Sequence, residues 1–222
     1  AVTGMQASMV ALGYEAPKIA RKKAIIFVLD NSGSMQIQDA AGHKSRMDAA
    51  MENLLMIYDK HIAVGDRVAL ITFDSHPKVR VDPTVKGGPG EPSDVLRARI
   101  ASCTDIGGAT ACYDGVMRAG NMADRLLDEH PDDSVWIVAL TDGEDNSSRT
   151  NTAAAVSRLA TAKWSLCMVG LGRLSNAETL KRLAQATPSG LFLEVQDATR
   201  LEEAFTAVAE TIARATMQLE TM

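Results

Sequence analysis

The chain has 222 residues, of which 46% are hydrophobic and 23% charged, which excludes a disordered or collagen-like protein and fits one large folded domain. Its net charge of −5 supplies no broad cationic surface, so nucleic acid and anionic membrane surfaces are not expected partners. No apolar stretch approaches the roughly 20 residues that span a bilayer, so direct membrane insertion is not expected either. We assign residues 1–21 to an N-terminal extension, interpreted as a short helix, and residues 22–222 to the domain.

Three cysteines occur, at Cys103, Cys112 and Cys167. Their number is odd and no pair has CxxC spacing, which argues against a disulfide framework and against a thiolate zinc site. This usage favours a reducing compartment, and hence the cytoplasm. An extracellular location remains open if the chain is an excised domain.

Short apolar runs along the chain predict strands that are covered on both faces. They lie at residues 24–29, 67–73, 135–140, 164–171 and 191–195. The segment Lys78–Val81 instead alternates charged and apolar residues after a turn, which predicts an antiparallel edge strand with one face in water.

Helical patterns separate these runs. One apolar stripe extends from Met47 to Tyr58 and another from Val116 to Leu127. The spacings Ser175-x-x-Glu178 and Thr199-x-x-Glu202 predict capping boxes that open two further helices. Strands that alternate with helices predict an α/β fold: a doubly wound, mostly parallel sheet of about six strands, one of them an antiparallel edge strand, with helices on both faces. In such sheets ligands bind outside the carboxyl ends of the strands.

Three polar segments fall at that edge of the predicted sheet. Asp30-Asn31-Ser32-Gly33-Ser34 comes at the end of the first run, Gly107-Gly108-Ala109-Thr110 opens a helix, and Thr141-Asp142-Gly143 follows the run at residues 135–140. Their carboxylates and hydroxyls are hard oxygen ligands, which suit octahedral Mg²⁺ or Mn²⁺. Ca²⁺ is less expected, because it takes six to eight oxygens and often bidentate carboxylates.

These three segments together resemble a von Willebrand factor type A domain, and the resemblance spans roughly residues 22 to 215. It implies a Rossmann-like fold that carries a metal-ion-dependent adhesion site. It also implies Mg²⁺ or Mn²⁺ as the ion, with a protein partner whose Asp or Glu carboxylate completes the coordination. The sequence departs from the commoner Gly-Gly-Thr at Ala109. By position, the implied metal ligands are Asp30, Ser32, Ser34, Thr110 and Asp142.

Other acidic residues lie near the same segments. They are interpreted mainly as solvated loop residues, and the alternative is that they add negative potential around the site. They are Asp39, Asp105, Glu144 and Asp145.

Catalytic patterns are weak in comparison. Ser32 stands where an aspartyl phosphatase needs a second carboxylate, and neither Ser32 nor Ser34 lies in a G-x-S-x-G motif. The four histidines have no metal-ligand or HExxH spacing, and no nucleotide-binding fingerprint occurs. We therefore assign no catalytic residue and do not expect an enzyme.

The sequence thus favours a divalent-cation-dependent protein-binding or adhesion module. An intracellular assembly or chaperone-type scaffold, which delivers clients to an ATPase or ligase, is the alternative. A metal-dependent hydrolase is the third possibility.

Overall fold

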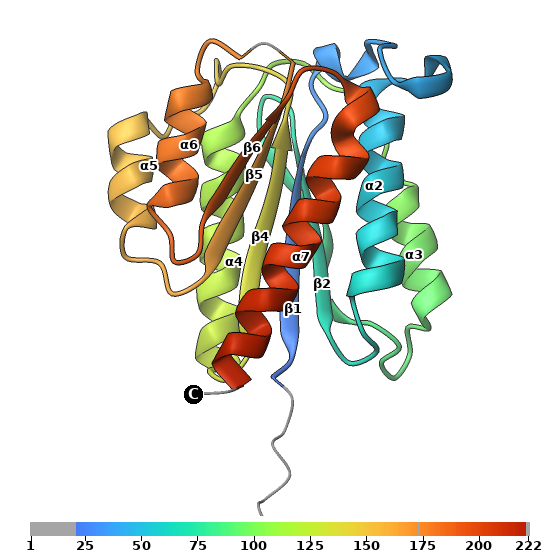
Figure 1. The fold of residues 1–222 in the computed structure, drawn as a ribbon, viewed down its shortest axis with the longest axis vertical. Helices are drawn as coiled ribbons and strands as arrows, with labels where there is room; N and C mark the ends of the chain where they lie inside the picture. The colour runs from blue at the N-terminus through green and yellow to red at the C-terminus, as the bar shows by residue number, and fades with distance from the viewer. Residues whose placement is uncertain (1–20, 173, 221–222) are drawn as a thin grey trace, which may run out of the picture.

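A computed structural model describes residues 21–172 and 174–220, and the helix expected within residues 1–20 lies outside the described residues. The core is one six-stranded sheet in the order β3-β2-β1-β4-β5-β6 (Figure 1). All neighbouring strands are parallel except β2 and β3, which are antiparallel. The strands are β1 (Lys23–Asp30), β2 (Arg67–Phe73), β3 (Pro77–Val85), β4 (Ser134–Thr141), β5 (Ser165–Leu171) and β6 (Leu191–Val195).

The predicted sheet is confirmed, including its antiparallel edge strand β3. Strand β4 is buried at every residue and β1 at every residue but the first, because helices cover both faces of the sheet. Alternate residues of β1 therefore enter different cores. Ile25 and Phe27 face one layer, whereas Ala24 and Ile26 face the other.

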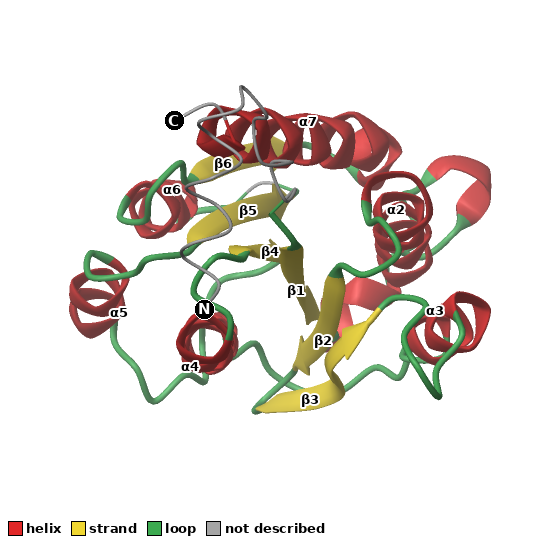
Figure 2. Cartoon of the chain, turned by 90° about the horizontal axis from the view of Figure 1, so that it is seen from below, coloured by secondary structure: helices red, strands yellow, loops and turns green. Residues whose placement is uncertain are grey.

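Helices cover both faces of the sheet in the described part of the chain (Figure 2). Helices α2, α3 and α7 pack on one face, and α4, α5 and α6 pack on the other. None of the helices in the described part of the chain is both long and apolar enough to cross a membrane. The helices are α2 (Arg46–His61), α3 (Ser93–Ala101), α4 (Cys112–Glu129), α5 (Thr152–Leu159), α6 (Ala177–Gln185) and α7 (Leu201–Glu220), preceded by the short 3₁₀ turn η1 (Gly33–Gln36).

Two predicted capping boxes are wrong. Asn176 precedes α6 and makes no side-chain cap, so Ser175 does not open that helix. Before α7, Asp197 accepts a hydrogen bond from the Thr199 backbone, and the chain makes a 3₁₀ turn before the helix begins. The aspartate cap wins because its carboxylate reaches the backbone N–H two residues on.

Strand β1 marks the point where the chain changes direction across the sheet. The chain winds from β1 to β2 and β3 on one side, and β4, β5 and β6 lie on the other. The carboxyl ends of β1 and β4 lie side by side at this point. Doubly wound proteins bind ligands at the corresponding place in their sheets. The loops after β1 and β4 and the loop before α4 all meet at this edge.

Candidate metal site

Asp30 is the last residue of β1, and its carboxylate is fully buried. Its Oδ1 accepts a hydrogen bond from the Ser32 backbone at 2.8 Å, and its Oδ2 accepts one from the Thr141 hydroxyl at 2.7 Å. Both donors are neutral, so they do not balance the charge of the carboxylate. Burial therefore raises the pKa of Asp30 to about 6, and the charge of nearby Asp142 contributes in the same direction.

The turn that follows β1 brings two hydroxyls beside a second acid. Ser32 directly precedes the 3₁₀ turn η1, and its Oγ lies 3.1 Å from Ser34 Oγ. Ser34 Oγ in turn donates to Asp142 Oδ1 at 2.6 Å. A continuous row of side-chain oxygens therefore runs from the end of β1 to the end of β4.

The loop before α4 is bound to both other loops. Gly107 N donates to Asn31 O at 2.7 Å, and Gly33 N donates to Gly108 O at 3.2 Å. Thr110 N donates to the Asn146 side chain at 2.9 Å. A Cβ built on Gly143 would lie 3.6 Å from Thr110 Oγ1, so the Thr110 hydroxyl faces the loop after β4.

The structure thus brings all five candidate residues to one edge of the sheet. Asp30, Ser32, Ser34 and Asp142 join through direct hydrogen bonds and a shared turn, and Thr110 lies across from them.

Arg46, the first residue of α2, is a member of this cluster that the sequence analysis missed. Its Nη1 donates to Asp142 Oδ2 at 2.9 Å, and its Nε and Nη2 donate to Asp39. The Asp142 side chain is fully buried and that of Arg46 is 13% exposed. No short sequence motif predicts this contact, because it joins residues that are 96 positions apart.

The interpretation of the surrounding acids as solvated loop residues is wrong for Asp39 and Asp145, whereas Asp105 is exposed although it forms an ion pair. Asp39 pairs with Arg46, and Asp105 pairs with Arg80. Asp145 accepts from the backbone N–H of Tyr113, at the start of α4. These acids anchor the loops that shape the site.

The donor set fits a hard cation held mainly by oxygen. Within the described residues, no three His, Cys, Asp or Glu side chains gather as a metal cluster. A cation here would therefore depend on the carboxylates of Asp30 and Asp142 together with the hydroxyls of Ser32, Ser34 and Thr110. Hydroxyl and carboxylate oxygens suit Mg²⁺ and Mn²⁺, and two acids that share one buried edge favour a positive ion between them.

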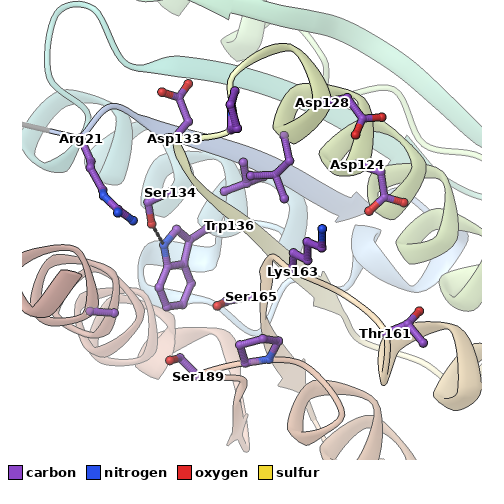
Figure 3. A pocket seen from close by; sticks show the side chains of 15 residues that line it. Arg21, Asp124, Asp128, Asp133, Ser134, Trp136, Thr161, Lys163, Ser165 and Ser189 are labelled. Carbon is purple, nitrogen blue, oxygen red and sulfur yellow. Dashed lines mark hydrogen bonds between the residues drawn. The ribbon is translucent and has the colours of Figure 1, made fainter. Parts of the chain in front are cut away.

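A cavity of about 630 Å³ lies at the opposite edge, where β4 and β5 begin (Figure 3). Several of its polar lining residues already have structural partners. Ser134 accepts from the Trp136 indole N–H, Asp124 pairs with Arg158, and Asp133 pairs with Arg67. Volume alone therefore does not mark the functional site. The convergence of oxygens at the other edge is the stronger indication.

Comparisons with known proteins agree with this fold. The model of the von Willebrand factor type A domain family matches residues 24–207. A mouse protein, calcium-activated chloride channel regulator 3A-1, is 31% identical over 205 residues, which cover 90% of this chain and 21% of that protein. Human calcium-activated chloride channel regulator 1 is 30% identical over 127 residues, which cover 57% of this chain and 12% of that protein. The chain therefore spans about a fifth or less of these relatives.

Solved structures show the same architecture. A von Willebrand factor type A protein from Catenulispora acidiphila has a TM-score of 0.70 at 20% identity, with 86% of this chain and 43% of that structure covered. Proximal thread matrix protein 1 from the mussel byssus, described with a zinc-occupied MIDAS motif, has a TM-score of 0.68 at 16% identity, with 86% and 48% covered. The chain belongs to the von Willebrand factor type A domain family.

Proposed function

We propose that this domain is a divalent-cation-dependent protein-binding module. Asp30, Ser32, Ser34, Thr110 and Asp142 hold Mg²⁺ or Mn²⁺, and a partner protein contributes an Asp or Glu carboxylate. The bound ion supplies positive charge that attracts this carboxylate. No residue is assigned a catalytic role.

One observation carries the proposal. The row of oxygens that runs from Ser32 through Ser34 to Asp142 begins beside the buried carboxylate of Asp30, whose own hydrogen-bond donors are neutral. A buried carboxylate without a compensating charge is costly, and a cation removes that cost. The family supports an interaction or adhesion role, and one similar fold is described with zinc in its MIDAS motif.

Acetate and Mn²⁺ test the proposal without a known partner, because acetate carries the carboxylate that a partner would present. Protein stripped with EDTA is loaded with Mn²⁺, and the relaxation of water protons reports the waters bound to the ion. Wild type is expected to enhance relaxation, and increasing acetate is expected to reduce that enhancement. Acetamide, which is similar in size but uncharged, serves as the control ligand.

Asp142→Ala provides the control protein. It is expected to give no enhancement with Mn²⁺, because it lacks one of the two acids. The proposal fails if wild type gives no enhancement either. It also fails if acetate and acetamide have the same effect on the wild type.

A further inference from the structure

The guanidinium of Arg46 occupies one side of the Asp142 carboxylate. Asp142 Oδ1 accepts from Ser34 Oγ, whereas Oδ2 accepts from Arg46 Nη1 at 2.9 Å. The two oxygens of this fully buried side chain therefore differ in their surroundings. Oδ1 faces the neutral hydroxyl of Ser34, whereas Oδ2 faces the positively charged guanidinium of Arg46.

Arg46 cannot easily leave this position. Its Nε donates to both oxygens of Asp39, at 3.1 and 3.0 Å, and its Nη2 donates to Asp39 Oδ2 at 2.6 Å. Such two-pronged pairs between arginine and a carboxylate fix orientation as well as charge. Its backbone is held too, because Ser45 closes a capping box at the start of α2.

This arrangement restricts how Asp142 can bind a cation. A bidentate contact would place the dication against Oδ2, on the same atom as the Arg46 guanidinium. Two positive groups at one oxygen repel each other, and displacement of Arg46 would break a charge-assisted hydrogen bond in a buried place. Of the two Asp142 oxygens, only Oδ1 accepts from a neutral donor and can face the dication without this repulsion.

We propose that Arg46 is a positioning residue that limits Asp142 to one ligating oxygen and thereby selects Mg²⁺ and Mn²⁺ over Ca²⁺. The inference rests on the proposed metal site. Six-coordinate ions accept single carboxylate oxygens, whereas Ca²⁺ takes six to eight oxygens and often binds carboxylates through both. Because Arg46 keeps Oδ2 of Asp142 from the ion, Ca²⁺ loses one of the oxygens that it would otherwise bind.

Calorimetric titration of EDTA-stripped protein with Mn²⁺ and with Ca²⁺ tests the inference through the ratio of the two dissociation constants. Wild type is expected to bind Mn²⁺ more tightly. In Arg46→Met, the preference for Mn²⁺ over Ca²⁺ is expected to fall by about tenfold, the equivalent of one charge-assisted hydrogen bond. Arg97→Met is the matched control, because Arg97 makes a similar pair with Asp59 at a distant exposed position.

Asp39→Asn is the second variant and decides the question if Arg46→Met does not fold. It keeps Arg46 but removes the charge that anchors it, so the preference is expected to fall by a smaller factor. A purely structural Arg46 would lower the melting temperature and leave the ion preference unchanged, which would overturn the inference. Wild type that binds neither ion would overturn the proposed function as well, whereas binding with unchanged ratios overturns this inference alone.

Discussion

Ser34 donates a 2.6 Å hydrogen bond to Asp142 across 108 positions of sequence. This contact joins the loop after β1 to the loop after β4, on the two sides of the point where the sheet changes winding direction. It directs a hydroxyl and a carboxylate toward the same small volume beside Asp30. The adhesion-type function proposed for this domain depends on that convergence.

Replacement of Ser34 by alanine removes both a hydroxyl ligand and the contact that orients Asp142. We expect the affinity for Mn²⁺ to fall about tenfold, since the lost hydrogen bond to a carboxylate is worth roughly 1.5 kcal/mol. Ser102→Ala is the control, because Ser102 Oγ bonds only a nearby carbonyl in an exposed place. Equal Mn²⁺ affinities in the two variants would argue against Ser34 as a ligand.

Asp30 makes the metal-free protein sensitive to pH. Its pKa is raised from 3.8 to about 6 by burial, so the folded state binds the proton more tightly than the unfolded state. The stability that this proton contributes is complete below about pH 4 and is lost as the pH rises through 6. Over the whole transition, from well below pH 4 to well above pH 6, wild type in EDTA is expected to lose about 3 kcal/mol relative to Asp30→Asn, which has no such proton to lose; about 2 kcal/mol of this falls between pH 4 and pH 6.

Urea unfolding of both proteins in EDTA, at several values between pH 4 and pH 7, measures this difference. The comparison with Asp30→Asn cancels the contributions of other acids, such as Asp74 and Asp114, whose pKa values are lowered by hydrogen bonds and neighbouring cations. If the difference in unfolding free energy between wild type and Asp30→Asn does not change with pH, the raised pKa of Asp30 is contradicted.

Asn146 holds Thr110 in place, and we expect it to affect the Mn²⁺ affinity although it is not itself a ligand. Its side chain accepts from Thr110 N, and its backbone N–H donates to Thr110 O at 3.0 Å. Asn146→Ala removes the first of these bonds, so a loss of about 1 kcal/mol in stability and a several-fold weaker Mn²⁺ affinity are expected.

Asn151→Ala separates the loss of stability from the loss of Mn²⁺ affinity. Asn151 caps α5 through the backbone N–H of Ala154, so its loss also costs about 1 kcal/mol. Thermal melting is expected to change alike in both variants, and Mn²⁺ affinity only in Asn146→Ala. The role given to Asn146 is wrong if both variants bind Mn²⁺ as wild type does.

Gly107 is required where the loop before α4 passes Asp74. A Cβ at Gly107 would lie 2.0 Å from Asp74 Oδ2 and 2.7 Å from its Cβ, so the loop must shift in Gly107→Ala. We expect a loss of roughly 1–3 kcal/mol in the free energy of unfolding, as for other overpacked sites. At Gly33, by contrast, the nearest atoms to such a Cβ are 3.8 Å away, so Gly33→Ala should melt close to wild type. Equal melting temperatures of the two variants would contradict this steric account.

The sheet was predictable because its parallel strands are buried on both faces and their sequences are continuously apolar. Helices α3 and α5 were not expected. Each buries only two side chains, Leu96 and Ile100 in α3 and Ala155 and Leu159 in α5, which is too short a stripe to distinguish from a loop. Burial of a full face is what makes a helix visible in sequence.

The candidate ligands were predictable for a different reason. Asp30 ends the buried strand β1 and Asp142 directly follows the buried strand β4, and the carboxyl ends of parallel strands share one edge. Arg46 and Asn146 could not be found in the same way, since their contacts depend on how α2 and the loop after β4 pack in three dimensions. Short motifs indicate the atoms that converge, whereas the residues that orient them depend on the tertiary structure.

A calorimetric titration of Mg²⁺ into EDTA-stripped wild type and Asp142→Ala protein is the most direct test of the metal-dependent function. We predict one ion per wild-type chain and no detectable binding to the variant, with both proteins folded by circular dichroism. Absence of binding to wild type, or equal binding to both proteins, would contradict the account.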